Sequence, residues 1–187
     1  MIFNNYSTLV GKHAFLSASK YHWINYDEEK LARVFAASMA AAQGTELHDL
    51  AHKLIKLRVK LKSDGSTLSL YVNDAIGFKM HPEQILYYSD NAFGTCDAIQ
   101  FRRNKLRIHD LKTGTTKTSE WQLIVYAALF CLEYNMRPHD IQIELRIYQS
   151  NEVQIWDDID PDVYVRVMDK IKLFDQRITE MRLEALS

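Results

Sequence analysis

The chain has 187 residues, of which 47% are hydrophobic and 25% charged, and its formal net charge is −1. This size and balance predict one folded domain with a sizeable core and exclude a disordered chain. The near-neutral charge excludes a uniformly basic surface, so any nucleic-acid-binding surface must be local.

The cysteines and the apolar segments bear on the compartment. Cys96 and Cys131 are too few for a disulfide framework or a four-cysteine metal site, which favours a reducing compartment. The N-terminal residues lack the charged and apolar regions of a secretory signal. The longest strongly apolar run, residues 123–132, is too short to cross a bilayer. We therefore expect a cytoplasmic protein without a membrane partner.

The N-terminal part of the chain, to about residue 80, is predicted to be mostly helical. Ser17-Ala18-Ser19 is expected to cap a short helix that runs through Trp23, and an acidic first turn opens an alanine-rich helix over 27–43. Gly44 is expected to break the pattern, so that a separate helix covers 45–61. A third helix, over 67–79, has apolar residues spaced for one buried face.

The 45–61 helix carries a polar stripe and a basic second half. His48, His52 and Lys56 follow one another four residues apart, which places them on one face. Such a stripe is either a solvated helix face or, at its basic end, a contact with a phosphate backbone. The two histidines are also spaced as a zinc pair, but Asp49 replaces the usual glutamate and no third ligand follows at a typical spacing. A zinc hydrolase is therefore one alternative.

The central feature is a predicted β-hairpin around Arg102-Arg103-Asn104-Lys105. Apolar and polar residues alternate on both sides of this run. If its two middle residues form the turn, its first and last residues face each other. Counting back along both strands then places Asp97 directly opposite Asp110.

Two carboxylates opposite each other on neighbouring strands repel unless something compensates their charge. A divalent cation is the natural compensation for Asp97 and Asp110, because hard cations prefer carboxylate oxygens. Lys112 lies two residues beyond Asp110 and points to the same side of the strand. A lysine there suits phosphodiester hydrolysis, in which it orients the attacking water or stabilises the developing charge.

The remaining order of elements predicts an α/β (α+β) fold. A strand over 83–89 precedes the hairpin, and a helix over 120–135 follows it. Strands are expected over 141–149 and 153–156, and a final helix begins with a cap and a first-turn proline at Asp160-Pro161.

The whole is predicted to be one domain in three parts. A helical part (about 1–80) precedes a sheet core (about 81–157) and a C-terminal helix (about 161–184). Apolar residues in the last helix alternate at spacings of three and four, as in a heptad seam. That seam either packs on the domain's own core or forms a subunit interface, which would make the protein a homo-oligomer.

Four short motifs occur in order between residues 44 and 126: Gly44-Thr45-Glu46-Leu47-His48, Gly94-Thr95-Cys96-Asp97, Asp110-Leu111-Lys112-Thr113-Gly114 and Gln122-Leu123-Ile124-Val125-Tyr126. They resemble the Gly-x-x-x-His, Gly-x-x-Asp, Asp-x-Lys-Thr-Gly and Gln-x-x-x-Tyr motifs of the RecB-type PD-(D/E)XK nucleases. Residues 139–187 carry no motif that resembles this family.

The resemblance implies a restriction-endonuclease-like core, a mixed sheet flanked by helices, and a nuclease that depends on Mg²⁺ or Mn²⁺. Asp97, Asp110 and the Leu111 backbone carbonyl would bind the metal, with His48 as a further ligand or neighbour. Lys112 would be the catalytic lysine.

The resemblance also implies roles around this core. Gln122 and Tyr126 would position the DNA backbone or the catalytic groups, although Gln122 also fits a capping box that starts at Ser119. Glu83 is a candidate for the outer shell of the site. The basic residues expected to contact the DNA backbone are Lys56, Arg102, Arg103 and Lys117.

The function implied by the resemblance is DNA cleavage, most naturally by a phage-encoded exonuclease that acts in recombination or DNA processing in the bacterial cytoplasm. A phage recombination or single-strand-binding protein would be a further partner. Some relatives carry an iron–sulfur cluster held by four cysteines, which two cysteines exclude here. A catalytically inactive nuclease fold that binds DNA or a protein is the other alternative.

Overall fold

The structure is a computed structural model that describes residues 14–16, 18–116 and 118–185. The chain divides into two compact units, Met1–Gln43 and Gly44–Ser187. In the first, the 3-10 helix η2 (Ala18–Asn25) precedes the first part of helix α1 (Glu28–Leu57), and the Phe15 ring packs edge-on against that of Phe35. The predicted short helix is thus of the 3-10 type, and Ser17, part of its expected cap, lies outside the described residues.

The prediction that Gly44 separates two helices is wrong, because α1 runs without interruption from Glu28 to Leu57. A glycine inside a helix costs only about 1 kcal/mol relative to alanine, which neighbouring turns can tolerate. Gly44 is buried, and a Cβ at this position would come within 2.7 Å of Thr113 Oγ1. The glycine therefore allows the helix to approach the loop that contains Thr113. The helix ends earlier than expected, at Leu57, and the next residue, Arg58, adopts a positive φ of 58°.

The second unit contains the sheet and most of the predicted elements. Ser66 caps helix α2 (Thr67–Gly77) by accepting a hydrogen bond from the Ser69 N–H. The elements after α1 are, in order, α2 (Thr67–Gly77), β1 (His81–Ser89), β2 (Ala92–Arg102), β3 (Lys105–Leu111), α3 (Trp121–Glu133), the 3-10 turn η3 (Pro138–Asp140), β4 (Gln142–Gln149), β5 (Glu152–Trp156) and α4 (Pro161–Glu184).

The sheet has the strand order β1-β2-β3-β4-β5. Strands β3 and β4 are parallel, and the other neighbouring pairs are antiparallel. The connection between the two parallel strands contains α3, as a parallel crossover requires. The molecule is therefore a mixed α/β fold with a five-stranded mixed sheet. The predicted order of elements is confirmed except for the two helices that form the continuous α1.

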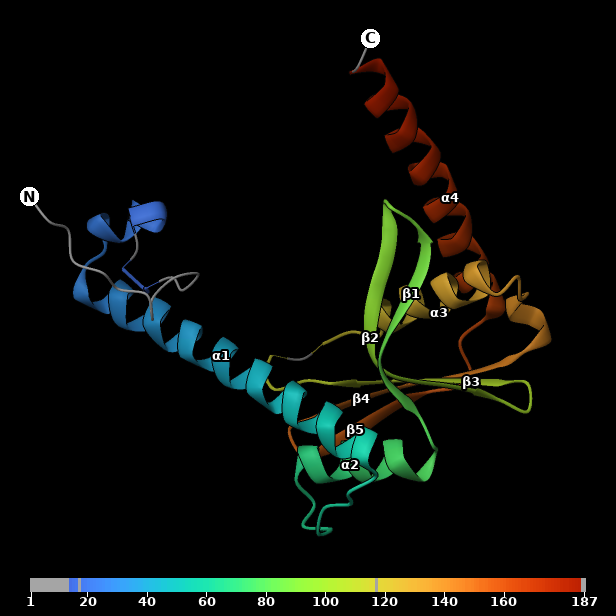
Figure 1. The fold of residues 1–187 in the computed structure, drawn as a ribbon, viewed down its shortest axis with the longest axis horizontal. Helices are drawn as coiled ribbons and strands as arrows, with labels where there is room; N and C mark the ends of the chain where they lie inside the picture. The colour runs from blue at the N-terminus through green and yellow to red at the C-terminus, as the bar shows by residue number, and fades with distance from the viewer. Residues whose placement is uncertain (1–13, 17, 117, 186–187) are drawn as a thin grey trace, which may run out of the picture. The chain divides into compact units, whose positions relative to one another are not determined.

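Helices cover both faces of the sheet (Figure 1). Helices α3 and α4 pack over a core cluster that includes Leu106, Ile108 and Leu145. On the other face, α2 and the end of α1 pack over a second cluster that includes Leu111 and Tyr148. In Figure 1 the β1–β2 hairpin bends away from β3, β4 and β5. The sheet therefore opens where β2 and β3 separate.

Several boundaries differ from the predictions by a few residues. β1 begins at His81 rather than at Glu83, although Pro82 cannot donate a ladder hydrogen bond. The proline is tolerated because β1 is an edge strand with a partner on one side only. None of the helices in the described part of the chain is long and apolar enough to cross a membrane.

The interpretation that the seam on α4 packs on the domain's own core is confirmed for the first half of the helix only, and the subunit interface stays a prediction. Asp160 caps α4 as predicted, by accepting a hydrogen bond from the Asp162 N–H. In the first half Tyr164 is buried, and Val167 and Ile171 pack on the core of α3 and the sheet. In the second half Phe174 and Met181 are exposed, together with Leu173 and Leu183. Only the first half is therefore a core helix.

The β2–β3 turn is the predicted one. Arg102 pairs with Lys105, and both turn residues, Arg103 and Asn104, have positive φ angles of 52° and 60°. Positive φ at both positions is the requirement of the two-residue type I′ turn, which favours Asn, Asp and Gly. An arginine in this backbone conformation is disfavoured because its Cβ crowds the following carbonyl.

We expect Arg103→Asn to stabilise the fold slightly. Asparagine tolerates the left-handed conformation better than arginine, and the described residues form no ion pair with Arg103 that the change would remove. The free energy of unfolding should rise by up to about 1 kcal/mol in urea denaturation. A fall of similar size would show that the arginine side chain stabilises the hairpin in a way that its contacts do not indicate.

Candidate metal centre

Asp97 and Asp110 lie where β2 and β3 separate. The paired residues run from Arg102 and Lys105 to Ala98 and His109, and the next residues outward are the two aspartates. Asp97 Oδ2 accepts a hydrogen bond from the Leu111 backbone N–H at 2.8 Å. The predicted register of the hairpin is therefore confirmed.

Glu83 adds a third carboxylate, exposed to solvent, on the neighbouring strand. Pro82 pairs with Ala98 and Gln84 pairs with Cys96, so Glu83 stands opposite Asp97. The glutamate has a positive φ of 53°, which is an unfavourable conformation for a residue with a Cβ. Acidic residues from β1, β2 and β3 thus follow one another across the sheet.

His48 joins this row from α1. Its Nδ1 lies 3.4 Å from Asp97 Oδ2, and one ligand atom from each of His48, Glu83 and Asp97 lies within 4.8 Å of the others. The hydrogen bond with Asp97 is the main factor that raises the pKa of His48, and the charges of Asp97, Asp110 and Glu83 add to it, against the effect of burial. The imidazole therefore lies in a field of carboxylates that also favours a bound cation.

The position of α1 follows from its contacts with the sheet. Ala51 and Ile55, one and two turns beyond His48, are buried in the same cluster as Leu111. Gly44, one turn before His48, permits the close approach to Thr113. The spacing from glycine to histidine in the first motif is thus the spacing that brings His48 beside Asp97.

Asp110 is the most buried of the three carboxylates, with 2% of its surface exposed. Burial raises its pKa to about 6, and the charge of Asp97 contributes, while Lys112 opposes the shift. The Lys112 Nζ lies 2.9 Å from Oδ2 and donates to Oδ1 at 3.2 Å. Asp110 Oδ2 has no hydrogen-bond donor of suitable geometry among the described residues. The neighbour of this oxygen is instead the Lys112 ammonium, so a metal ion bound here would compete with that charge.

Lys112 is held at one end of a chain of polar contacts. Its backbone N–H donates to the Tyr148 carbonyl at 2.9 Å, and its Nζ donates to Gln122 Oε1 at 2.7 Å. Gln122 Nε2 donates to the Tyr126 hydroxyl at 3.2 Å, which in turn donates to the Thr95 carbonyl at 2.6 Å. The chain links β3 through α3 to β2, two residues before Asp97.

The expectation that Ser119 caps the helix before Gln122 is wrong. α3 begins at Trp121, and the residue at its N-cap position is Glu120, whose side chain makes no capping hydrogen bond. Gln122 is therefore in the second helical position, one residue too early for the capping box. Its side chain turns instead to Lys112 and Tyr126.

We expect Tyr126→Phe to loosen this chain of contacts without unfolding the protein. The change removes one acceptor for Gln122 and one donor to Thr95, which is worth about 0.5–1.5 kcal/mol in unfolding free energy. Urea denaturation measures that loss. Tyr134→Phe, at an exposed tyrosine near the end of α3, is the control and should change the free energy of unfolding by less. Equal effects of the two substitutions would contradict the assigned contacts.

The other predicted residues are not all at this centre. Lys56 is exposed in the last turn of α1, and Arg102 and Arg103 are exposed at the closed end of the β2–β3 hairpin. Lys117 lies outside the described residues. The role of the Leu111 carbonyl as a ligand stays a prediction.

His52 does not join the candidate ligands. It is half-buried one turn beyond His48, and its Nδ1 has no hydrogen-bond partner within the described part of the chain. The one group of three or more potential ligands found there contains His48 with Glu83 and Asp97. Cys96 is fully buried, and burial raises the pKa of its thiol to about 12. Neither residue adds a ligand.

Comparison with known proteins gives no further guide. The chain matches no family model, and no curated protein is significantly similar to it.

Proposed function

We propose that the protein is a divalent-metal-dependent nuclease of the RecB-type PD-(D/E)XK group and hydrolyses phosphodiester bonds in DNA. One observation carries this proposal: residues from all four family-like motifs lie together around the opening between β2 and β3. His48, Asp97, Asp110 with Lys112, and Gln122 with Tyr126 come from four separate elements. A nuclease core of this family would also have a mixed sheet flanked by helices.

Asp97 and Asp110 would hold Mg²⁺ or Mn²⁺, with His48 and Glu83 completing the protein ligands. The fit rests on the ligand atoms of His48, Glu83 and Asp97, which lie within 4.8 Å of one another. Asp110 stands beside Asp97 on the neighbouring strand. Hard divalent cations prefer such oxygen ligands. When bound, the metal would polarise the phosphate and lower the pKa of a water ligand.

Lys112 would act on the reacting phosphate. Its ammonium group is held between Asp110 and Gln122, at the border of the carboxylate row. There it can orient the attacking water or stabilise the negative charge that develops on the phosphoryl oxygens. Gln122 and Tyr126 would act as positioning residues, because they fix the direction of the lysine rather than touch the carboxylates.

A cleavage assay on defined DNA substrates tests the proposal. Linear duplex, single-stranded and closed circular DNA are incubated with Mg²⁺, Mn²⁺ or EDTA. We expect cleavage that requires the metal, and digestion of linear DNA alone would indicate the proposed exonuclease mode. Absence of metal-dependent cleavage on every substrate would refute the enzyme, and DNA that is bound but uncut would favour a binding module. His52→Ala should only weaken cleavage, whereas a zinc hydrolase that uses this histidine would lose it.

A further inference from the structure

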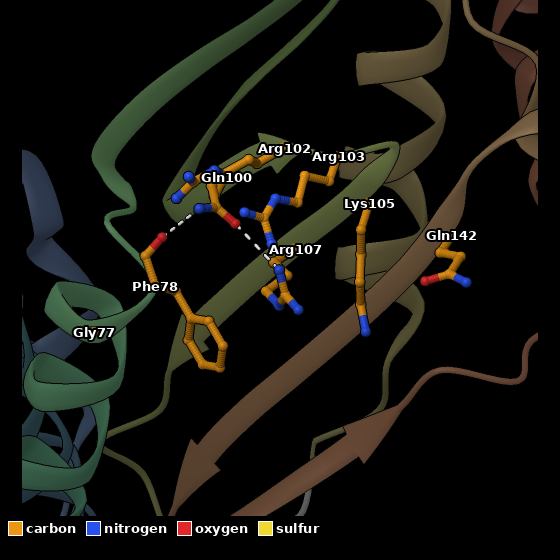
Figure 2. Close-up of a pocket in the computed structure, with 8 residues that line it drawn as sticks. All are labelled: Gly77, Phe78, Gln100, Arg102, Arg103, Lys105, Arg107 and Gln142. Atoms are coloured by element: carbon orange, nitrogen blue, oxygen red, sulfur yellow. Dashed lines mark hydrogen bonds between the residues drawn. The ribbon is translucent and has the colours of Figure 1, made fainter.

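A polar pocket of about 380 Å³ lies at the closed end of the β2–β3 hairpin, beside the C-terminal end of α2 (Figure 2). Figure 2 shows basic side chains gathered on one face of the hairpin, with Phe78 on one side and Gln142 on the other. Four of the residues that line it carry positive charge: Arg102, Arg103, Lys105 and Arg107. No carboxylate is among the lining residues.

The pocket is separate from the candidate metal centre. Arg102 lies five residues beyond Asp97 along β2, which corresponds to roughly 17 Å at the rise of an extended strand. The side chains of Gln100 and Arg107, which are paired across the two strands, point to the face opposite that of Asp97 and Asp110. A ligand in the pocket therefore does not occupy the place of the metal.

Positive charge in and around the pocket exceeds the negative charge that could neutralise it. The buried Glu144 is shared by three cations: it lies 2.5 Å from Lys105 Nζ, 3.2 Å from Arg107 Nε and 2.9 Å from Arg146 Nη2. Within the described residues, Arg102 and Arg103 take part in no ion pair. The side of the pocket that faces solvent therefore carries positive charge without a neighbouring carboxylate, which favours the binding of an anion.

The inner part of the pocket is rigidly built. Arg107 Nη1 donates to Gln100 Oε1 at 3.2 Å, and its guanidinium lies 4.7 Å from the centre of the Phe78 ring. Gln100 in turn donates to the Phe78 carbonyl (Figure 2). Because these groups are already fixed, a ligand would pay little conformational entropy to use them.

The hairpin turn adds an independent observation. Arg103 occupies a type I′ position with φ of 52°, where Asn, Asp or Gly would be more stable. The turn thus holds an exposed arginine in an unfavourable backbone conformation at the mouth of a basic pocket. A functional requirement for the positive charge of Arg103 would explain why an arginine occupies this turn position.

We propose that this pocket binds a phosphate group through Arg102, Arg103, Lys105 and Arg107. Guanidinium groups match phosphate oxygens with two parallel hydrogen bonds, and the lysine adds a point charge. The volume suits one or two phosphate groups, either from a nucleic-acid strand that crosses the hairpin or from a free nucleotide. The site is independent of the proposed nuclease activity and holds even if the carboxylate row has another function.

Binding measured in EDTA tests the site apart from any metal. The probes are inorganic pyrophosphate, followed by calorimetry, and a labelled 12-nucleotide single strand, followed by anisotropy. The test variants are Arg103→Asn, which suits the turn, and the double variant Arg102→Ala with Arg103→Asn. The charge-matched control is Arg166→Ala with Arg182→Ala, which removes two exposed arginines from α4. Thermal unfolding of each variant checks that the fold is retained.

We expect the double variant to weaken binding at least tenfold and the control to change it less than twofold. Loss of affinity for pyrophosphate and the strand together identifies the backbone of a nucleic acid as the source of the phosphate. Loss of affinity for pyrophosphate alone identifies a free phosphate compound as the ligand. Loss of affinity for the strand alone identifies a site for the nucleic-acid backbone. If neither probe distinguishes the folded double variant from the control, the assignment is overturned.

Discussion

Replacing Lys112 with alanine should lower the rate of metal-dependent DNA cleavage by about 10³-fold and leave Mn²⁺ binding intact. The ammonium group lies 2.9 Å from Asp110 Oδ2 and 2.7 Å from Gln122 Oε1, and the proposed mechanism uses it on the attacking water or the developing charge and not as a metal ligand. Its loss should also remove a positive charge that competes with the metal, so that Mn²⁺ binding becomes equal or tighter. Single-turnover cleavage and calorimetric Mn²⁺ titration measure the two effects separately.

Lys62→Ala is the matched control for this substitution, because Lys62 is an exposed lysine in the connection between α1 and α2. Its cleavage rate should stay within about twofold of the unmodified protein, since surface substitutions of this kind rarely matter. A Lys112→Ala protein that retains a tenth or more of the original rate would remove the lysine from the catalytic assignment.

Replacing Asp110 with asparagine should abolish cleavage and yet stabilise the protein without metal. The buried carboxylate is held close to Asp97, and both its burial and that neighbouring charge disfavour its ionised form. Removing the charge should raise the free energy of unfolding by about 1 kcal/mol in EDTA, after the loss of the Lys112 contact is allowed for. Mn²⁺ affinity should fall about 100-fold, because an amide is a poorer ligand than a carboxylate.

Urea unfolding with EDTA and with saturating Mn²⁺ separates the effect of Asp110→Asn on stability from its effect on Mn²⁺ binding. In the unmodified protein the metal should add stability, because it binds the folded state. In Asp110→Asn that gain should largely disappear. Asp157→Asn, at an exposed aspartate after β5, is the control and should preserve it. Lower stability in EDTA combined with unchanged Mn²⁺ affinity would contradict a metal role for Asp110.

The part of the site on β2 and β3 could be predicted because a two-residue turn determines its strand pairing. Positive φ angles at Arg103 and Asn104 produce the predicted register, and that register brings Asp97 to the level of Asp110. Lys112 then follows from the alternation of side chains along a strand. These inferences need only local geometry, which sequence patterns describe well.

Glu83 could not be placed in the same way. Counting back from the Asp90-Asn91 turn would set Gln84 opposite Asp97, because Ser89 pairs with Ala92. A bulge between Tyr87 and Ser89 shifts the pairing by one residue and brings Glu83 to that position instead. One extra residue in a strand reverses which side chains face the site. The alternation of apolar and polar residues in β1 does not indicate this bulge.

Two features of the helices could not be predicted from the sequence either, because they depend on contacts with other elements. Gly44 was expected to end a helix from its intrinsic propensity, but its buried position beside Thr113 makes the missing Cβ useful within a continuous helix. Gln122 fitted a local capping pattern, but its amide contacts Lys112, ten residues earlier. Propensity and capping rules describe a chain segment alone and do not include a partner from another element.

Anomalous diffraction from a crystal of the protein soaked in Mn²⁺ tests the central claim most directly. The account predicts a manganese peak bound by Asp97 and Asp110, with His48 or Glu83 as a further ligand, and loss of that peak in Asp110→Asn crystals. A peak on His52, a peak away from the opening between β2 and β3, or no ordered manganese at saturating concentration would contradict it.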